Sequence, residues 1–259
     1  MTRLQRISLL AFSVFVVFAV ALSYMMGATL FADQDRPWHM QPFTDADSLT
    51  EEYTAKYEQL GRNQLLGTLT DSTRTTVAVL VDAWGVPFDE NLLAENFAAF
   101  KDLPHKEYLH YRLANRTRHA EFAELRVLGD STRLRDDVYL FGGDSLEYGR
   151  NLYIDSLGYG QHVFCQKCTD SVMLGKLDSL LTLDSLFTPE VVKVVALITQ
   201  DSRGGDWAKL HATLRGIAEV ARKHPGIRFI VQGTHRPILG DPKIRRESFA
   251  HWVPALVIN

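Results

Sequence analysis

The segment that most constrains the fold is an uninterrupted run of apolar, largely β-branched residues, TTVAVLV at Thr75–Val81. A run of this kind is typical of a strand buried on both faces, as in a parallel sheet with helices on each side. Similar runs recur at Val138–Phe141, Val191–Thr199, Ile227–Val231 and Val253–Ile258. The sequence therefore predicts a sheet with several buried strands.

Helical patterns lie between these runs, at Glu90–Phe100, Ala120–Val127, Ser171–Leu181 and Trp207–Lys223. The dipeptide Pro225-Gly226 ends the last of them before the next strand begins. Strands that alternate with helices indicate an α/β domain with a mostly parallel sheet flanked by helices.

The N-terminal stretch Ile7–Ala32 contains no charged residue. It is long enough for a transmembrane helix, which needs about 20 residues. Arg3 and Arg6 before it and Asp33 after it favour an orientation with the N-terminus inside and the rest of the chain outside. We expect one transmembrane helix ahead of the α/β domain. A cleaved signal peptide is the alternative, although Leu30 is large for the usual cleavage site.

The chain is thus expected to have three parts. Residues 1–32 form the anchor or signal peptide, and residues 33–73 are polar and form a stalk or linker. A short helix is expected within the linker, at Glu51–Leu66. Residues 74–259 form the α/β domain and carry the chemistry.

Composition excludes some classes of protein. Of 259 residues, 46% are hydrophobic and 23% are charged, which is the composition of a globular chain rather than a disordered one. The formal net charge of −3 leaves no basic excess to replace phosphate counterions. We therefore expect no nucleic-acid partner.

Cys165 and Cys168 are the two cysteines of the chain and form a single CxxC motif. In an exported protein, such a pair can close a small disulfide. A redox motif is expected at the start of a helix that follows a strand, and a zinc site requires two more ligands nearby. His162 is the one close candidate ligand, so the CxxC motif is a weak signal.

Polar residues follow three of the expected strands. Asp82 ends the first strand, Asp201 follows Val191–Thr199, and Thr234 and His235 follow the Ile227–Val231 strand. In α/β sheets, sites form at the carboxyl ends of the strands. A carboxylate and a histidine at that edge could share a divalent cation. The alternative is that Asp82 caps a turn and His235 bonds a loop.

Five segments, taken in order, resemble the alkaline phosphatase superfamily. The similarity is closest to its membrane-anchored, sulfatase-like branch, which includes lipoteichoic acid synthases and phosphoglycerol and phosphoethanolamine transferases. The segments are VAVLVDAWGVPFDE (77–90), RTRHAEFAEL (116–125), FGGDSLEYGRNLYIDSLGYG (141–160), IRFIVQGTHRPIL (227–239) and HWVPALVIN (251–259).

This resemblance implies an alkaline phosphatase-like fold and roles for particular residues. Asp82, Thr117 and His235 would hold one divalent cation, Mn or Zn, with Thr117 as the nucleophile. Arg150 and Arg236 would bind the anionic substrate through forked hydrogen bonds. The reaction would have two steps, in which Thr117 takes the phospho-group and passes it to a hydroxyl or to water.

The sequence departs from the family pattern at several points. Thr234 stands where the family has Asp, and a hydroxyl coordinates divalent metal more weakly than a carboxylate. Gly142 stands where the branch has one His. A further His-containing element of the branch is replaced by Asp201-Ser202-Arg203-Gly204-Gly205, where Asp201 is a candidate replacement ligand. The chain also stops at Asn259, where the family's domain usually continues. A catalytically silent member, which binds an envelope glycan or regulates a full-length transferase, therefore remains an alternative to the enzyme.

The resemblance also implies a location and partners. We expect a single-pass protein of a bacterial-type inner or cytoplasmic membrane, with its domain on the extracytoplasmic, periplasmic side. The expected substrate is a lipid or glycan of the cell envelope. A further expectation is a protein partner at the C-terminal edge, since an unpaired Val253–Ile258 strand would tend to pair with another chain.

Overall fold

The computed structural model describes residues 12–21, 48–61, 75–112, 117–125, 135–142, 157, 159–183, 194–202, 205–237 and 247–259. The chain divides into two units, Met1–Thr44 and Asp45–Asn259. Each unit is described by itself.

In the first unit, residues 12–21 are helical. The remainder of the expected transmembrane segment 7–32 lies outside the described residues. Among the helices that the structure does describe, none has both the length and the apolar character needed to cross a bilayer.

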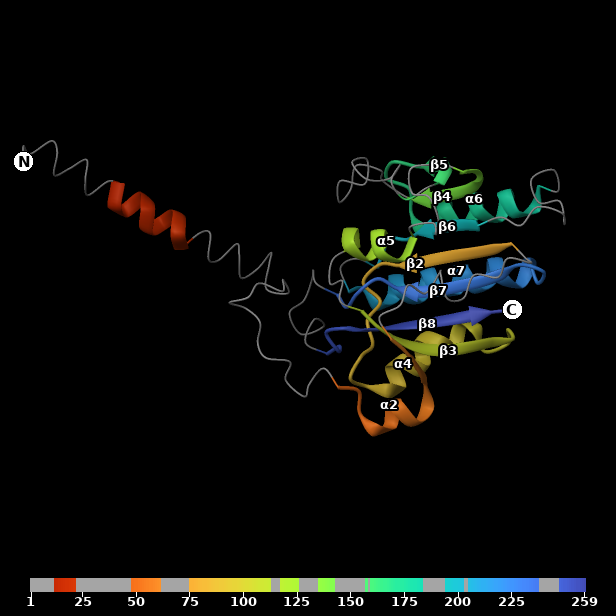
Figure 1. The fold of residues 1–259 in the computed structure, drawn as a ribbon, viewed down its shortest axis with the longest axis horizontal. Helices are drawn as coiled ribbons and strands as arrows, with labels where there is room; N and C mark the ends of the chain where they lie inside the picture. The colour runs from red at the N-terminus through yellow and green to blue at the C-terminus, as the bar shows by residue number, and fades with distance from the viewer. Residues whose placement is uncertain are drawn as a thin grey trace, which may run out of the picture. The chain divides into compact units, whose positions relative to one another are not determined.

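The second unit is built on an eight-stranded sheet with the order β1-β3-β8-β7-β2-β6-β4-β5 (Figure 1). Its strands are β1 (Glu58–Leu60), β2 (Thr76–Val81), β3 (His105–Tyr111), β4 (Arg135–Gly142), β5 (Tyr159–Phe164), β6 (Val194–Ile198), β7 (Arg228–Gly233) and β8 (Trp252–Ile258). Its helices are α2 (Glu51–Lys56), α4 (Glu90–Phe97), the 3-10 turn η2 (Ala98–Phe100), α5 (Thr117–Leu125), α6 (Asp170–Thr182) and α7 (Trp207–Lys223).

The expected α/β architecture is confirmed. Among the described strands, neighbours pair in parallel except where β8 is involved, since β8 runs antiparallel to both β3 and β7. Every residue of β2 is buried, in agreement with its continuous apolar sequence. The sheet is therefore mostly parallel, with one antiparallel strand inserted.

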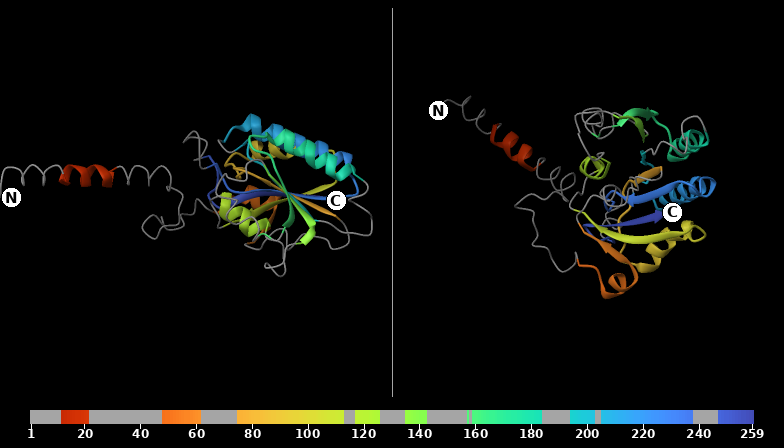
Figure 2. Two further views of the ribbon diagram at one scale, coloured as in Figure 1. Left: turned by 90° about the horizontal axis from the view of Figure 1, so that it is seen from above. Right: turned by 45° about the vertical axis from the view of Figure 1, so that its right-hand side comes forward.

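Two apolar cores cover the two faces of this sheet. On one face, Val77, Val79 and Val81 of β2 pack in a cluster that includes residues of α2, α4, α6 and α7. On the other face, Ala78 and Leu80 share a cluster with Leu125 of α5. Figure 2 shows α6 and α7 on one side of the sheet and α5 on the other. The alternation of side chains along β2 thus separates the two layers of helices.

The parallel strands end at one edge of the sheet. Asp82 follows β2 there, Thr199 follows β6 and Thr234 follows β7, while β4 ends at Gly142 and Cys165 follows β5. Polar and reactive side chains from distant parts of the sequence therefore meet along this edge, where sites form in sheets of this kind.

Residues 51–60 differ from the expected linker, because they belong to the domain. Tyr53 and Tyr57, one helical turn apart, are both buried in the core, and the Tyr53 hydroxyl donates to the Pro87 carbonyl at 2.6 Å. β1 adds a parallel strand beside β3. Burial of the two tyrosine rings accounts for the docking of this segment.

β8 is an interior strand, paired with β3 on one side and β7 on the other. The expectation of an unpaired edge at Val253–Ile258 is therefore wrong. That expectation followed from the place of this strand as the last in the sequence, and the order of strands along a chain does not fix their order in a sheet. The protein partner itself stays a prediction.

Candidate active site

Asp82 lies at the point where the chain leaves β2 and turns sharply. The next residue, Ala83, has a φ of 54°, a left-handed conformation that is uncommon outside glycine. Its N–H donates to Oδ1 of Asp82 and to Oγ1 of Thr234, both at 3.1 Å. The turn thereby folds the backbone back onto the Asp82 carboxylate and orients it.

A glycine brings the end of β7 close to this turn. A Cβ on Gly233 would lie 1.9 Å from the carbonyl oxygen of Trp84, which only glycine avoids. The two residues that follow, Thr234 and His235, are consequently held against the Asp82 turn. Thr234 donates its hydroxyl to Asp82 Oδ1 at 3.0 Å.

Thr117 is the first residue of α5 and completes the group. Its Oγ1 lies 3.1 Å from Oδ1 of Asp82 and 2.9 Å from Nε2 of His235. The Asp82 Oδ1 to His235 Nε2 distance is 3.5 Å. The side chains of Asp82, Thr117, Thr234 and His235 are all at most 3% exposed. Three polar side chains from two other segments thus converge on one carboxylate oxygen of Asp82.

The chemistry of the His235 ring follows from its second contact. Its Nδ1 lies 2.6 Å from the carbonyl oxygen of Arg236, which can only accept. Nδ1 must therefore carry a proton, and in the neutral ring Nε2 presents a lone pair toward Thr117. This is the arrangement of a histidine that accepts a proton or ligates a metal.

Thr117 has one hydroxyl proton for two close neighbours. If it donates to Asp82, its lone pairs face Nε2 of His235, and if it donates to Nε2, they face the Asp82 carboxylate. A cation among these three atoms, either a second proton or a metal ion, relieves the remaining lone-pair contact. The arrangement is suited to a hydroxyl that loses its proton.

Two residues that the sequence analysis missed hold the backbone of Asp82. Thr199 Oγ1 accepts from the Asp82 N–H at 3.1 Å, and Ser202 Oγ donates to the Asp82 carbonyl at 2.5 Å. Both side chains are buried and follow β6. The polar cluster directly after the Val191–Thr199 run was the one sequence signal for them.

A buried ion pair, also missed, secures helix α5. Arg112 follows β3, and its Nη2 donates to the Ala120 carbonyl at 3.3 Å and lies 3.4 Å from Oε1 of Glu124. Burial lowers the pKa of Arg112, and the Glu124 carboxylate opposes this by favouring the charged form. The pair connects the end of β3 to α5 and thereby fixes the helix that begins with Thr117.

Comparison with solved structures identifies the fold. The chain is similar to the lipoteichoic acid synthase LtaP from Listeria monocytogenes, with 9% identity and a TM-score of 0.52 over 72% of this chain and 65% of that one. It is also similar to a protein in the alkaline phosphatase superfamily from Vibrio parahaemolyticus, with 13% identity and a TM-score of 0.50 over 74% and 61%. The chain has the alkaline phosphatase superfamily fold. It spans less than two thirds of either neighbour. No protein-family model and no curated protein sequence matches it.

The residues that were expected to hold metal do not all lie together in this fold. Asp82, Thr117, Thr234 and His235 lie together, as described above. Asp201 lies elsewhere, because its Oδ2 accepts from the Asp170 N–H at 2.9 Å, at the start of α6. Among the described residues, no group of three or more His, Cys, Asp and Glu side chains is placed to hold a metal ion.

The two residues expected to bind substrate are less defined. Arg236 is half-buried beside the site, and its carbonyl orients His235. Arg150 lies outside the described residues. Neither role is tested by the geometry, so both stay predictions.

The donor atoms at Asp82 fit a single small cation. They are one carboxylate, one imidazole nitrogen and two hydroxyls. The distances from Asp82 Oδ1 to the other three groups, and from Thr117 Oγ1 to His235 Nε2, run from 2.9 to 3.5 Å. Ligands about 2.0–2.2 Å from a divalent ion lie roughly 3 Å from one another. The spacing therefore suits a coordination shell, whereas the single carboxylate makes it a weak one.

Proposed function

We propose that this chain is a metal-dependent transferase or hydrolase that acts on phospho-substituents of cell-envelope lipids or glycans, with Thr117 as its nucleophile. The observation that carries the proposal is the position of Thr117 Oγ1, 3.1 Å from the Asp82 carboxylate and 2.9 Å from His235 Nε2, at the first residue of a helix. The fold shared with a lipoteichoic acid synthase supports the same class of reaction.

In the first step, Thr117 Oγ forms a bond to the substrate phosphorus, and the bond from phosphorus to the leaving oxygen breaks. The Thr117 hydroxyl proton is lost to water, and the leaving alcohol takes up a proton from water as it departs. In the second step, an acceptor hydroxyl or water attacks the phosphothreonine, and Thr117 regains its proton. The N–H groups of the first turn of α5 would bind the phosphate oxygens.

A divalent cation, Mn or Zn, would be held by Asp82, Thr117 and His235, with Thr234 as a weaker fourth ligand. When bound, it would favour the deprotonated form of the Thr117 hydroxyl and balance the charge on phosphate. Arg236, and Arg150 in the part of the chain outside the described residues, would bind the non-bridging oxygens.

The proposal includes a location outside the cytoplasm on a bacterial-type inner or cytoplasmic membrane, with residues 7–32 as the anchor. The uncharged N-terminal stretch preceded by Arg3 and Arg6 supports it. The Cys165–Cys168 disulfide supports it as well, because such bonds persist in oxidising compartments. An anchor would confine the site to the surface where envelope lipids and glycans lie.

The test is the metal stoichiometry of the purified protein after equilibration with manganese or zinc, compared with His235→Ala. We expect about one bound ion per chain, and its loss in the variant. His162→Ala removes an exposed histidine of β5 and should bind metal as the wild type does. A folded protein that holds no ion at this site would overturn the proposal in favour of a catalytically silent member, which the Thr234 substitution favours.

A further inference from the structure

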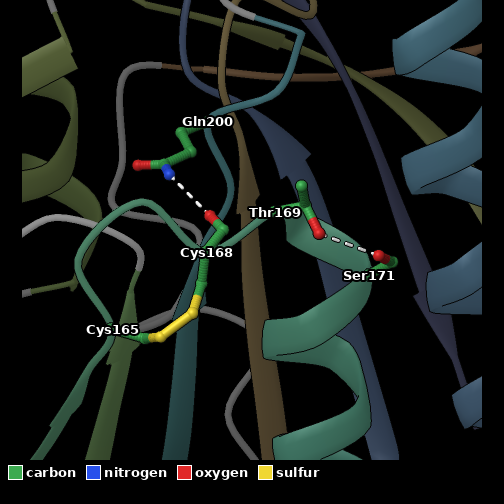
Figure 3. Close-up of a disulfide and its surroundings, with 5 residues drawn as sticks. All are labelled: Cys165, Cys168, Thr169, Ser171 and Gln200. Carbon is green, nitrogen blue, oxygen red and sulfur yellow. Dashed lines mark hydrogen bonds between the residues drawn. A yellow bond between two sulfur atoms is a disulfide. The ribbon is translucent and has the colours of Figure 1, made fainter.

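The two cysteines lie between a strand and a helix at the same edge of the sheet as Asp82. β5 ends at Phe164, the Cys165–Cys168 disulfide follows directly, and α6 begins at Asp170 (Figure 3). Both cysteines are half-buried, while the two residues between them are exposed. A thiol in solution therefore has access to this loop without unfolding of the sheet.

The backbone between the cysteines is held in an unusual conformation. Lys167 has a φ of 61°, in the left-handed region that side chains other than glycine rarely adopt. The Cys168 N–H donates to the Cys165 carbonyl at 3.2 Å and closes the turn. The cross-link keeps Lys167 in this region, so reduction of the bond lets the turn relax.

The cysteine turn is bonded to the loop that follows β6. The carbonyl of Cys168 accepts from Gln200 Nε2 at 2.9 Å, as Figure 3 shows. The backbone N–H groups of Gln200 and Asp201 donate to the two oxygens of Asp170, at 2.8 and 3.1 Å. In return, Asp201 Oδ2 accepts from the Asp170 N–H at 2.9 Å. The loop after β6 is thus hydrogen-bonded both to the cysteine turn and to the start of α6.

The same loop holds Asp82 on its other side. Thr199 Oγ1 and Ser202 Oγ bond the N–H and the carbonyl of Asp82, at 3.1 and 2.5 Å. Within loop 199–202, Thr199 and Ser202 therefore fix the backbone of Asp82. Gln200 and Asp201, between them, bind the cysteine turn and the start of α6. A displacement of the turn is passed to Asp82 through a segment of only four residues.

We infer that the Cys165–Cys168 pair is a thiol–disulfide exchange site whose redox state controls how firmly loop 199–202 holds Asp82. The reactant is a dithiol, either a small molecule or a protein with two cysteines. One of its thiolates attacks a sulfur of the pair, which releases the other cysteine as a thiolate and forms a mixed disulfide. Its second thiolate then attacks the reagent's own sulfur in that mixed disulfide and releases the cysteine that was attacked. The pair gains two electrons and two protons and becomes two thiols, and the dithiol becomes a disulfide. This inference does not depend on the proposed activity.

The experiment measures amide hydrogen exchange, resolved to single residues, in the full chain before and after treatment with excess dithiothreitol under native conditions. Alkylation and mass measurement first confirm that both thiols have been released. We expect exchange at Gln200 and Asp201 to become about tenfold faster on reduction, and exchange at Asp82 and Ala83 about threefold faster. The amides of Gln200, Asp201 and Asp82 donate the hydrogen bonds made by loop 199–202, so they report its contacts directly. The Ala83 amide donates to Asp82 Oδ1 and Thr234 Oγ1, so it reports the turn after Asp82.

Three variants separate the steps of the argument. Cys165→Ser combined with Cys168→Ser should exchange like the reduced wild type and not respond to dithiothreitol. Gln200→Ala removes the bond to the Cys168 carbonyl, so reduction should no longer change exchange at Asp82. Gln166→Ala is the matched control, because this exposed glutamine lies within the same turn, and it should behave as the wild type.

Two results would overturn the inference. Without denaturant, dithiothreitol could release no thiols, and the pair would then be an inert bond. Alternatively, reduction could change exchange only within residues 165–168, and the disulfide would then be a local brace with no effect on Asp82. If the double cysteine variant fails to fold, the reduced wild type still decides between these outcomes.

Discussion

Two buried aspartates, Asp82 and Asp170, lie at the same edge of the sheet and have different partners. Asp170 accepts from the N–H groups of Gln200 and Asp201 and from the Thr213 hydroxyl at 2.8 Å. These two N–H groups can only donate, and they fix Asp170 as an acceptor. Burial, together with the neighbouring Asp201 carboxylate, raises the pKa of Asp170 to about 6 against the lowering effect of these hydrogen bonds. Asp170 therefore has a structural role, which is to hold the start of α6 against the residues that follow β6.

Asp82 is surrounded by groups that can change their role. The hydroxyls of Thr117 and Thr234 can donate or accept, and His235 Nε2 can lose or gain a proton. Such groups can rearrange around a cation or pass a proton to one another, whereas backbone N–H groups cannot. Burial of an aspartate therefore does not distinguish a functional site from a structural contact. The chemistry of its hydrogen-bonding partners does.

The largest expected effect separates Thr117, which donates to Asp82, from Thr213, which donates to Asp170. Thr117→Ala should lower turnover of a nitrophenyl phosphodiester by about 10³-fold or more, because the nucleophile is absent. Thr213→Ala should keep its turnover per folded molecule. Each variant removes a buried hydroxyl that donates to a carboxylate, so each should lose about 1–2 kcal/mol of stability. Both variants are compared with the metal-loaded wild type by initial rates and chemical denaturation.

Thr117→Ser is the conservative variant, since it keeps the hydroxyl and should keep measurable turnover. A metal-loaded wild type with no turnover, or a Thr117→Ala variant as active as the wild type, would break the comparison. Either result would mean that Asp82, like Asp170, has a structural role and no catalytic one.

A second effect depends on pH and is confined to Asp170. Its folded pKa of about 6 exceeds its value of 3.8 in an unfolded chain, so between these pH values the folded state holds a proton that the unfolded state has lost. Stability should therefore fall as pH rises from about 4 to 6, by on the order of 3 kcal/mol. Urea denaturation of the wild type and Asp170→Asn at several pH values measures it.

Asp170→Asn cannot titrate at this position, so this component of the slope should be absent from its stability profile, even though the variant is less stable throughout. The informative quantity is the difference between the two profiles. Parallel curves between pH 4 and 6 would show that the carboxyl does not take up a proton on folding.

The fold was predictable where burial leaves a pattern in the sequence. β2 and β7 are buried along nearly their whole length, and β8 is as well, so each appears as a continuous apolar run. Helix α7 has the bounds predicted for it, because a wide apolar face and Asp206 at its N-cap mark it clearly. β3 and β5 were missed, since their sequences, HKEYLHY and YGQHVF, are only partly buried.

The site was predictable to the extent that strand ends and family resemblance point to particular residues. Asp82, Thr117, Thr234 and His235 were all named on those grounds, and they lie together. Thr199, Ser202 and Arg112 were not, because a serine, a threonine or an arginine after a strand is ordinary in sequence. Their roles arise from contacts between segments more than a hundred residues apart, or between a strand end and the next helix.

The smallest expected effect comes from Thr234→Asp, which restores the carboxylate of the family pattern beside Asp82. In Thr234→Asp, a second negative charge would lie about where Thr234 Oγ1 now lies, 3.0 Å from Asp82 Oδ1. Without metal, repulsion and the lost hydroxyl donor should cost about 1–2 kcal/mol of stability. With manganese or zinc, the second carboxylate should tighten binding by about tenfold or more, which offsets that loss.

Thermal unfolding with and without metal measures both parts of this effect, and Thr234→Asn is the matched control because it has similar size and no charge. The asparagine variant should be destabilised without metal and gain little from it. If the two variants respond equally to metal, the charge at position 234 does not face the cation. The donor set around Asp82 would then be complete without it, and the departure from the family pattern at Thr234 would have no bearing on whether the protein is active.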